Sequence, residues 1–194
     1  MKRILLISFL FLSLVLCFVS VGRAGGVDDL KAGIAAYKQG DYDGAVRLCT
    51  QAIASGDLSQ KNLCVAYINR GNAWRHKGDY DRALADYNKV IELDPKDDAG
   101  YDGAAWLLAV CPESKYRDGV KAVKLAKKAV ELRDWYGNID TLAAAYAEAG
   151  RSQEAIKTQE MAITKLKEEG GTKDLPELEE HLSSYKAGKP WREK

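Results

Sequence analysis

A seven-residue motif that recurs along the chain limits the fold more than any other feature of the sequence. Gln39–Ala45 reads QGDYDGA, Lys77–Ala83 reads KGDYDRA, and Ala149–Ala155 is a weaker copy, AGRSQEA. An Ala-rich segment precedes and follows each copy, and the 194 residues include only four Pro. Ala costs least in a helix and Pro costs most. Repetition of this kind predicts an all-α solenoid of helical hairpins.

Residues 64–97 resemble the tetratricopeptide repeat (TPR) family most closely. That family alternates small and large residues at set positions of a 34-residue unit, and eight positions fit here: Tyr67, Gly71, Trp74, Gly78, Tyr80, Ala83, Tyr87 and Pro95. Gly71 and Ala83 would let two helices approach closely. We expect Gly78 to end the first helix and Pro95 to close the second.

Looser copies flank this window. We expect repeat 1 at 26–59, repeat 2 at 64–97, a TPR-like repeat 3 with an enlarged turn at 98–134, and repeat 4 at 136–168. The enlarged turn, Cys111–Gly119, resembles that of a bacterial sub-type of the family. Residues 172–187 fit a C-terminal capping helix, which repeat arrays need, and residues 189–194 are expected to fray.

The N-terminus has the pattern of an export signal. Lys2 and Arg3 precede an apolar stretch, Ile4–Val21, and small residues at Gly22 and Ala24 suit cleavage after Ala24. Ser20 and Gly22 would allow a cut two residues earlier. The protein is therefore expected to be periplasmic or secreted.

Two alternatives use the same N-terminal residues. The apolar stretch at 4–21 is long enough to span a bilayer if it is not cut, which would anchor the protein to the membrane. Lipid attachment at Cys17 fits less well, because Leu16 stands where a small residue is wanted.

Three Cys follow residue 24. Cys49 and Cys64 lie on consecutive expected helices, which leaves a disulfide between them open. The alternative is that they are small buried apolar residues, which is the interpretation favoured for Cys111. There is no Cys-x-x-Cys pair, so no metal site is expected.

The TPR resemblance implies a concave groove lined by the first helix of each repeat. Mapped onto this sequence, its inward-facing positions are Tyr37, Lys38, Asn69, Asn72, Arg75, His76, Asp102, Trp106, Asp140, Thr141 and Glu148. Each could instead be ordinary helix surface, and Trp106 could pack rather than bind. One TPR sub-class grips a C-terminal carboxylate, but only Asn69 matches that clamp, since Leu30, Ile34 and Gly103 replace its other positions.

The sequence gives little support for nucleic-acid binding or for enzyme activity. Without residues 1–24 the net charge changes from +1 to −2, and nucleic-acid binding needs a concentrated basic surface. Neither His76 nor His181 belongs to a recognisable catalytic motif, so no enzyme activity and no cofactor are expected.

The resemblance predicts an exported adaptor or scaffold that binds a protein or peptide partner in its groove. The alternative is a structural or self-assembling envelope component that associates through convex or terminal faces.

Overall fold

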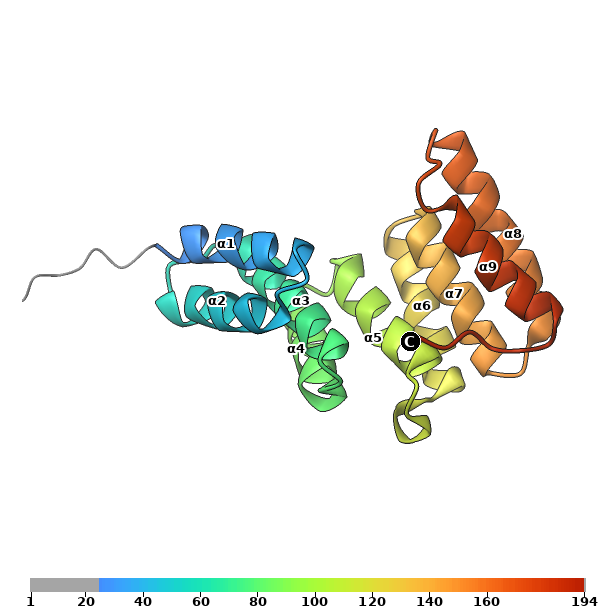
Figure 1. The fold of residues 1–194 in the computed structure, drawn as a ribbon, viewed down its shortest axis with the longest axis horizontal. Coiled ribbons are helices and arrows are strands. Elements are labelled where there is room, and N and C mark those ends of the chain that lie inside the picture. The colour runs from blue at the N-terminus through green and yellow to red at the C-terminus, as the bar shows by residue number, and fades with distance from the viewer. Residues whose placement is uncertain (1–24, 194) are drawn as a thin grey trace, which may run out of the picture.

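The computed structural model describes residues 25–193, and the expected signal at 1–24 lies outside them (Figure 1). In the described part all regular structure is helical, which confirms the all-α prediction. The helices are α1 (Gly26–Lys38), α2 (Tyr42–Ser55), α3 (Gln60–His76), α4 (Tyr80–Leu93), α5 (Asp98–Val110), α6 (Gly119–Leu132), α7 (Tyr136–Glu148), α8 (Ser152–Glu168) and α9 (Leu175–Lys186), with a 3₁₀ turn η1 (Ser114–Tyr116). No helix within 25–193 is long and apolar enough to cross a membrane.

Small residues allow the helices to pair as hairpins. α1 packs on α2, α3 on α4, α5 on α6 and α7 on α8. Ala45, Ala83, Ala122 and Ala155 hold equivalent places on the second helices, and all four are fully buried. A Cβ added to Gly71 would lie 2.9 Å from the Tyr87 ring, so the close approach of α3 and α4 requires a glycine there.

The Gly-Asp-Tyr motif builds the turn inside a hairpin. Gly40 and Gly78 adopt φ of +79° and +77°, a left-handed conformation that favours glycine. The next residue caps the following helix: the Asp41 carboxylate accepts a hydrogen bond from the Gly44 N–H at 2.8 Å. Asp79 makes the equivalent bond at its own helix. The glycine of the motif therefore ends one helix, and the Asp that follows it caps the start of the next helix.

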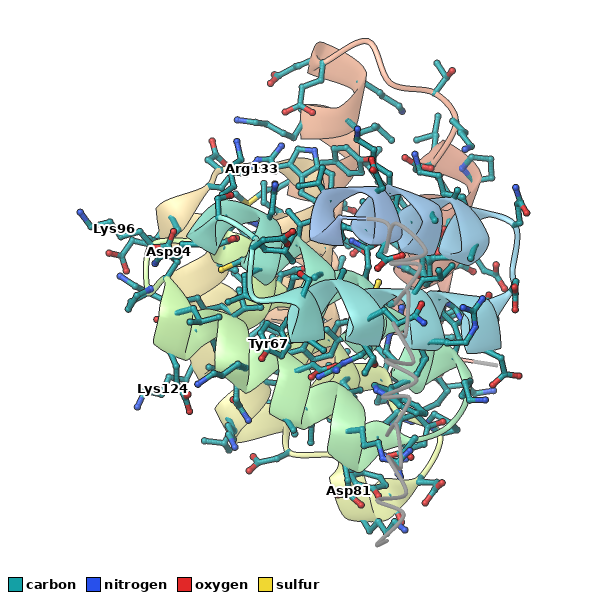
Figure 2. All side chains as sticks on the ribbon, turned by 90° about the vertical axis from the view of Figure 1, so that its left-hand side faces the viewer. Tyr67, Asp81, Asp94, Lys96, Lys124 and Arg133 are labelled. Carbon is teal, nitrogen blue, oxygen red and sulfur yellow. The ribbon has the colours of Figure 1, made fainter. Side chains whose placement is uncertain are left out.

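The array curves toward its first helices. α1, α3, α5 and α7 contact their neighbours in that series, whereas α2, α4, α6 and α8 make no comparable contacts with one another within 25–193. The first helices of the hairpins are thus packed more closely against one another than the second helices are. This difference places a concave face on α3, α5 and α7. On the outer surface, Asp81, Lys96 and Lys124 project into solvent with mixed charge (Figure 2).

Residues 189–193 do not fray, contrary to expectation, and residue 194 lies outside the described residues. After α9 the chain turns at Gly188 and runs back to α5, so that the last described residues lie beside that helix (Figure 1). We call residues 187–193 the C-terminal strap. The Glu193 N–H donates to the Val110 carbonyl at 3.0 Å, and the Arg192 guanidinium donates to the Ala109 carbonyl at 3.3 Å. The strap thereby ties α9 to the end of α5.

Candidate functional site

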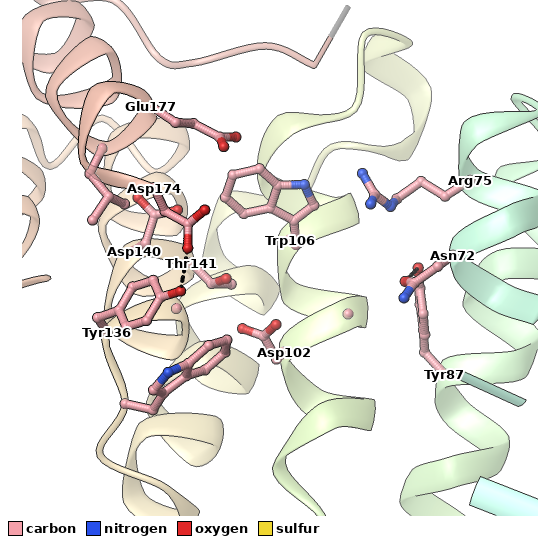
Figure 3. Close-up of a pocket in the computed structure, with 14 residues that line it drawn as sticks. Asn72, Arg75, Tyr87, Asp102, Trp106, Tyr136, Asp140, Thr141, Asp174 and Glu177 are labelled. Atoms are coloured by element: carbon pink, nitrogen blue, oxygen red, sulfur yellow. Dashed lines mark hydrogen bonds between the residues drawn. The ribbon is translucent and has the colours of Figure 1, made fainter. Parts of the chain in front are cut away.

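A cavity of about 290 Å³ opens on the concave face, with walls from α3, α4, α5, α7, α9 and the segments that precede α7 and α9. Figure 3 shows Asp102 and Trp106 at its centre, with Arg75 and Asn72 on one side and Asp140, Thr141, Asp174 and Glu177 on the other. Six of the eleven predicted groove residues line it: Asn72, Arg75, Asp102, Trp106, Asp140 and Thr141. We call this space the acidic cavity.

Helical spacing brings these side chains together. Asp102 and Trp106 are four residues apart on α5 and therefore share a face. Asn72 and Arg75 on α3 are three apart and share the face opposite them. Gly103 also lines the cavity, and a Cβ there would lie 2.7 Å from the Tyr87 ring. The absent side chain leaves room for Tyr87 at the cavity wall.

Four carboxylates define the electrostatics of the cavity: Asp102, Asp140, Asp174 and Glu177. Asp140 is nearly buried, and its Oδ1 accepts hydrogen bonds from Gln159 Nε2 at 2.7 Å and His181 Nδ1 at 2.9 Å. Asp174 accepts a hydrogen bond from the Tyr136 hydroxyl at 2.6 Å. Glu177 stands at the rim with 66% of its side chain exposed. Two of the acids are thus held by neighbours and one faces solvent.

Asp102 differs from the other acids. Its Oδ1 is buried and has no hydrogen-bond partner among the described residues. Burial raises the pKa of this carboxyl to about 7, and the charges of Asp140 and Asp98 act in the same direction. Thr141 and Arg75 favour the ionised form but only partly offset these effects. The structure therefore holds a carboxyl with one buried oxygen that lacks a donor.

Aromatic rings supply the remaining walls. Trp106, Trp135 and Tyr136 all line the acidic cavity, and the rings of Trp135 and Tyr136 lie 4.7 Å apart. Trp106 also packs against the α5–α6–α7 core, with its ring 5.8 Å from that of His181. Trp106 thus packs on the core and also lines the cavity, while its role in binding stays a prediction.

Arg75 connects the cavity to the C-terminal strap. Its guanidinium forms an ion pair with Glu193, although the two residues are 118 positions apart. Asn72 beside it accepts a hydrogen bond from the Tyr87 hydroxyl at 2.7 Å. The strap also pairs Arg192 with Glu148, which is bonded to Arg117 at 3.1 Å as well. The strap is thus held through groove side chains.

The other predicted groove residues lie elsewhere. His76 stacks on Tyr42 at 4.6 Å, and its Nε2 lies 3.1 Å from the Tyr37 hydroxyl. Lys38 is exposed at the end of α1. Asn69 donates to the Val65 carbonyl of its own helix at 2.8 Å. These residues, with Glu148, do not line the acidic cavity.

The cavity also contains residues that the repeat positions did not predict. Trp135 and Tyr136 lie at the start of α7, and the only sequence signal for them is their aromatic character next to Gly137. Asp174 and Glu177 come from the cap, which lies outside the repeats and has no repeat position to map. Contacts with the cap could not be derived from the TPR pattern.

The disulfide considered for Cys49 and Cys64 is absent from the structure, where both thiols are free. Their surroundings differ. Cys49 lies against α1, near Gly33 and the Arg70–Asp86 pair, while Cys64 is close to Asp94 and Asp97 after α4. Both are buried, as is Cys111. Burial raises the pKa of Cys49 to about 11, as expected for an unreactive packed thiol.

Comparison with known proteins identifies two of the repeats. A family model described as tetratricopeptide repeat matches residues 64–97, and a second model with that description matches residues 29–55. No curated protein matches the sequence.

Solved structures share the fold at low sequence identity. The TPR protein TTC0263 from Thermus thermophilus is 17% identical, with a TM-score of 0.67 over 84% of this chain and 82% of that one. MamA from Desulfovibrio magneticus RS-1, residues 41 to the end, is 19% identical, with a TM-score of 0.58 over 84% of this chain and 88% of that one. At this level of identity the likeness concerns the fold.

Proposed function

The chain is a tetratricopeptide-repeat protein, and we propose that it is an adaptor whose concave face binds a segment of another protein around the acidic cavity. Such repeats generally mediate protein–protein contact, and the proposal gives this chain a non-catalytic, scaffolding role. The observation that carries it is the gathering of six groove residues from three different first helices around one cavity.

The C-terminal strap supports the proposal, because it is a non-helical segment bound on the same side of the array. It uses a main-chain hydrogen bond to Val110 and ion pairs to Arg75 and Glu148. A partner segment that lies along α5 and α7 would meet the same kinds of group: carbonyls at helix ends, paired charges and aromatic rings.

Site-specific photocrosslinking tests the proposal. A photoreactive phenylalanine derivative in place of Trp135 sits in the cavity wall and replaces one aromatic ring by another. The same derivative in place of Met161, 53% exposed on the outer helix α8, is the matched control. We expect position 135 to crosslink a partner protein in cells and position 161 to leave it uncaptured. Partner capture at 161 but not at 135 would contradict the groove assignment.

Self-assembly is the second candidate, and exposed apolar side chains favour it. Val120 is 80% exposed on α6, and Met161 lies beside a surface hollow on α8. In this case the derivative at position 161 would crosslink a second copy and give a product of twice the chain mass. A concentration-independent monomer in size-exclusion chromatography with light scattering would count against it.

Export is a separate part of the proposal, and it rests on residues 1–24. Cleavage after Ala24 would leave Gly25 as the first residue of the mature protein. The intact mass of protein purified from cell fractions tests this directly. A full-length mass in the membrane fraction would indicate the uncleaved anchor instead.

A further inference from the structure

Acidic side chains outnumber basic ones in the lining of the acidic cavity. Asp102, Asp140, Asp174 and Glu177 line it, while Arg75 is the only Lys or Arg among its lining residues. Arg75 already forms an ion pair with Glu193 of the C-terminal strap. The His181 ring contacts two of these acids, with Nδ1 2.9 Å from Asp140 Oδ1 and Nε2 3.9 Å from Glu177 Oε1. The lining therefore favours a cationic group over an anionic one.

The aromatic walls favour the same kind of occupant. Trp106, Trp135 and Tyr136 line the space, and the face of an aromatic ring attracts a cation within about 6 Å of its centroid. The chain already makes this contact with one of these rings, since the Arg133 guanidinium lies 4.9 Å from the centroid of the Trp135 ring. Rings and carboxylates together suit a cation with an apolar stem.

Asp102 marks where the charged end of such a group would lie. Its Oδ1 is buried without a hydrogen-bond partner in the described structure. Its carboxyl group points toward α7 (Figure 3). Buried polar atoms are almost always hydrogen-bonded, so an orphan at a cavity wall points to a donor from outside. A lysine ammonium or an arginine guanidinium offers several N–H donors.

The cavity suits an organic cation better than a metal ion. At about 290 Å³ it far exceeds the roughly 30 Å³ that one water occupies in the liquid, so it has room for a long side chain. No group of three His, Cys, Asp or Glu among residues 25–193 is placed to hold a metal ion. Asp140, Asp174 and Glu177 lie on one side of the cavity and Asp102 lies at its centre (Figure 3).

We infer that the acidic cavity binds the lysine or arginine side chain of a partner segment, between its carboxylates and its aromatic rings. This inference rests on the proposed function, since it names the chemistry that the groove recognises. It also explains why Asp102 is kept at a site where its charge is costly: the cationic partner group would supply the missing donor.

Three small probes test the inference without knowledge of the partner. They are the N-acetyl N′-methylamides of lysine, arginine and the neutral, similarly shaped norleucine. Binding is followed by the NMR signals of the Trp indole N–H groups. Trp106 and Trp135 report on the cavity, and Trp74, which is not part of its lining, is the internal reference. We expect both cationic probes to shift Trp106 and Trp135 saturably, and norleucine and Trp74 to show no such shift.

Charge-removing variants locate the site. Asp102→Asn should weaken cationic probe binding roughly tenfold or more, because it removes a buried charge from a charge-assisted hydrogen bond. Glu177→Gln at the rim should weaken it roughly two- to fivefold, the range for an exposed ion pair. Glu179→Gln, two residues away on α9 and outside the cavity lining, is the matched control and should leave binding unchanged.

The outcomes separate the two proposals. Equal shifts with norleucine, or no saturable shift with either cationic probe, would overturn the inference. If photocrosslinking at position 135 still captured a partner, the groove function would stand with a different recognition chemistry. A preference for arginine over lysine, or the reverse, would support the inference and identify the side chain.

Discussion

Asp102→Asn should stabilise the protein at pH 8 and change little at pH 4. The carboxyl has its pKa raised from 3.8 to about 7 by burial in the cavity wall. The folded protein therefore prefers the protonated form. Below pH 4 the group is protonated in both folded and unfolded chains, and no penalty arises. Between pH 4 and pH 7 the unfolded chain ionises first, so the folded state loses stability as the pH rises.

The difference between the pKa of Asp102 in the folded and unfolded states determines how much the free energy of unfolding changes. A difference of about three pKa units, at about 1.4 kcal/mol each, gives an upper value of about 4 kcal/mol above pH 7. The side chain keeps some access to solvent through the cavity, which screens its charge, so we expect about 2 kcal/mol. Asn keeps the shape of the side chain and removes its charge, which makes the substitution a direct probe of this penalty.

Urea unfolding at pH 4, 6 and 8 measures the effect as the difference in free energy of unfolding between variant and wild type. Asp28→Asn is the control, since that carboxylate is 70% exposed on α1. The expected difference for Asp102→Asn grows with pH, while that for Asp28→Asn stays small. A constant difference across the pH range, or destabilisation at pH 8, would refute the account of Asp102 as a carboxyl whose pKa is raised by its place in the cavity wall.

Three further predictions concern the C-terminal strap and the packing of the helices. Deletion of residues 189–194 should lower the unfolding free energy by about 2–4 kcal/mol in urea titration, because it removes the Trp191 packing and leaves the Arg75 charge without its partner. Gly71→Ala should cost about 1–3 kcal/mol by calorimetry, since its Cβ would crowd Tyr87; a neutral result would show that α3 and α4 can separate. Cys49 should resist thiol reagents until the protein unfolds, because it is buried with its pKa raised to about 11, and rapid labelling in the native state would contradict its placement.

The hairpins were predictable because their signals are local. Gly78 ends α3 and Asp79 begins α4 within two residues, and both act through their own backbone or a bond three residues away. The small residues Gly71 and Ala83 likewise fix the distance between two helices that are adjacent in sequence. These effects can be read from a 34-residue window without knowledge of the rest of the chain.

The candidate site was only partly predictable. Repeat positions predicted Asp102 and Trp106 on the concave side, and both side chains line the acidic cavity. They could not show that Asp174 of the cap would join that wall. They also could not predict the contact between Glu193 and Arg75. That contact joins residues 118 positions apart and depends on how the whole array curves.

Recognition of a basic side chain of another protein by the acidic cavity can be tested with peptides. The most direct measurement is selection of binders from a displayed library of random peptides, followed by titration of the enriched peptides against variants. The account predicts enriched peptides that contain lysine or arginine. Their affinity should fall at least tenfold for the double variant Asp102→Asn, Glu177→Gln and stay unchanged for Glu179→Gln. Enriched peptides without a basic residue, or with full affinity for the double variant, would contradict it.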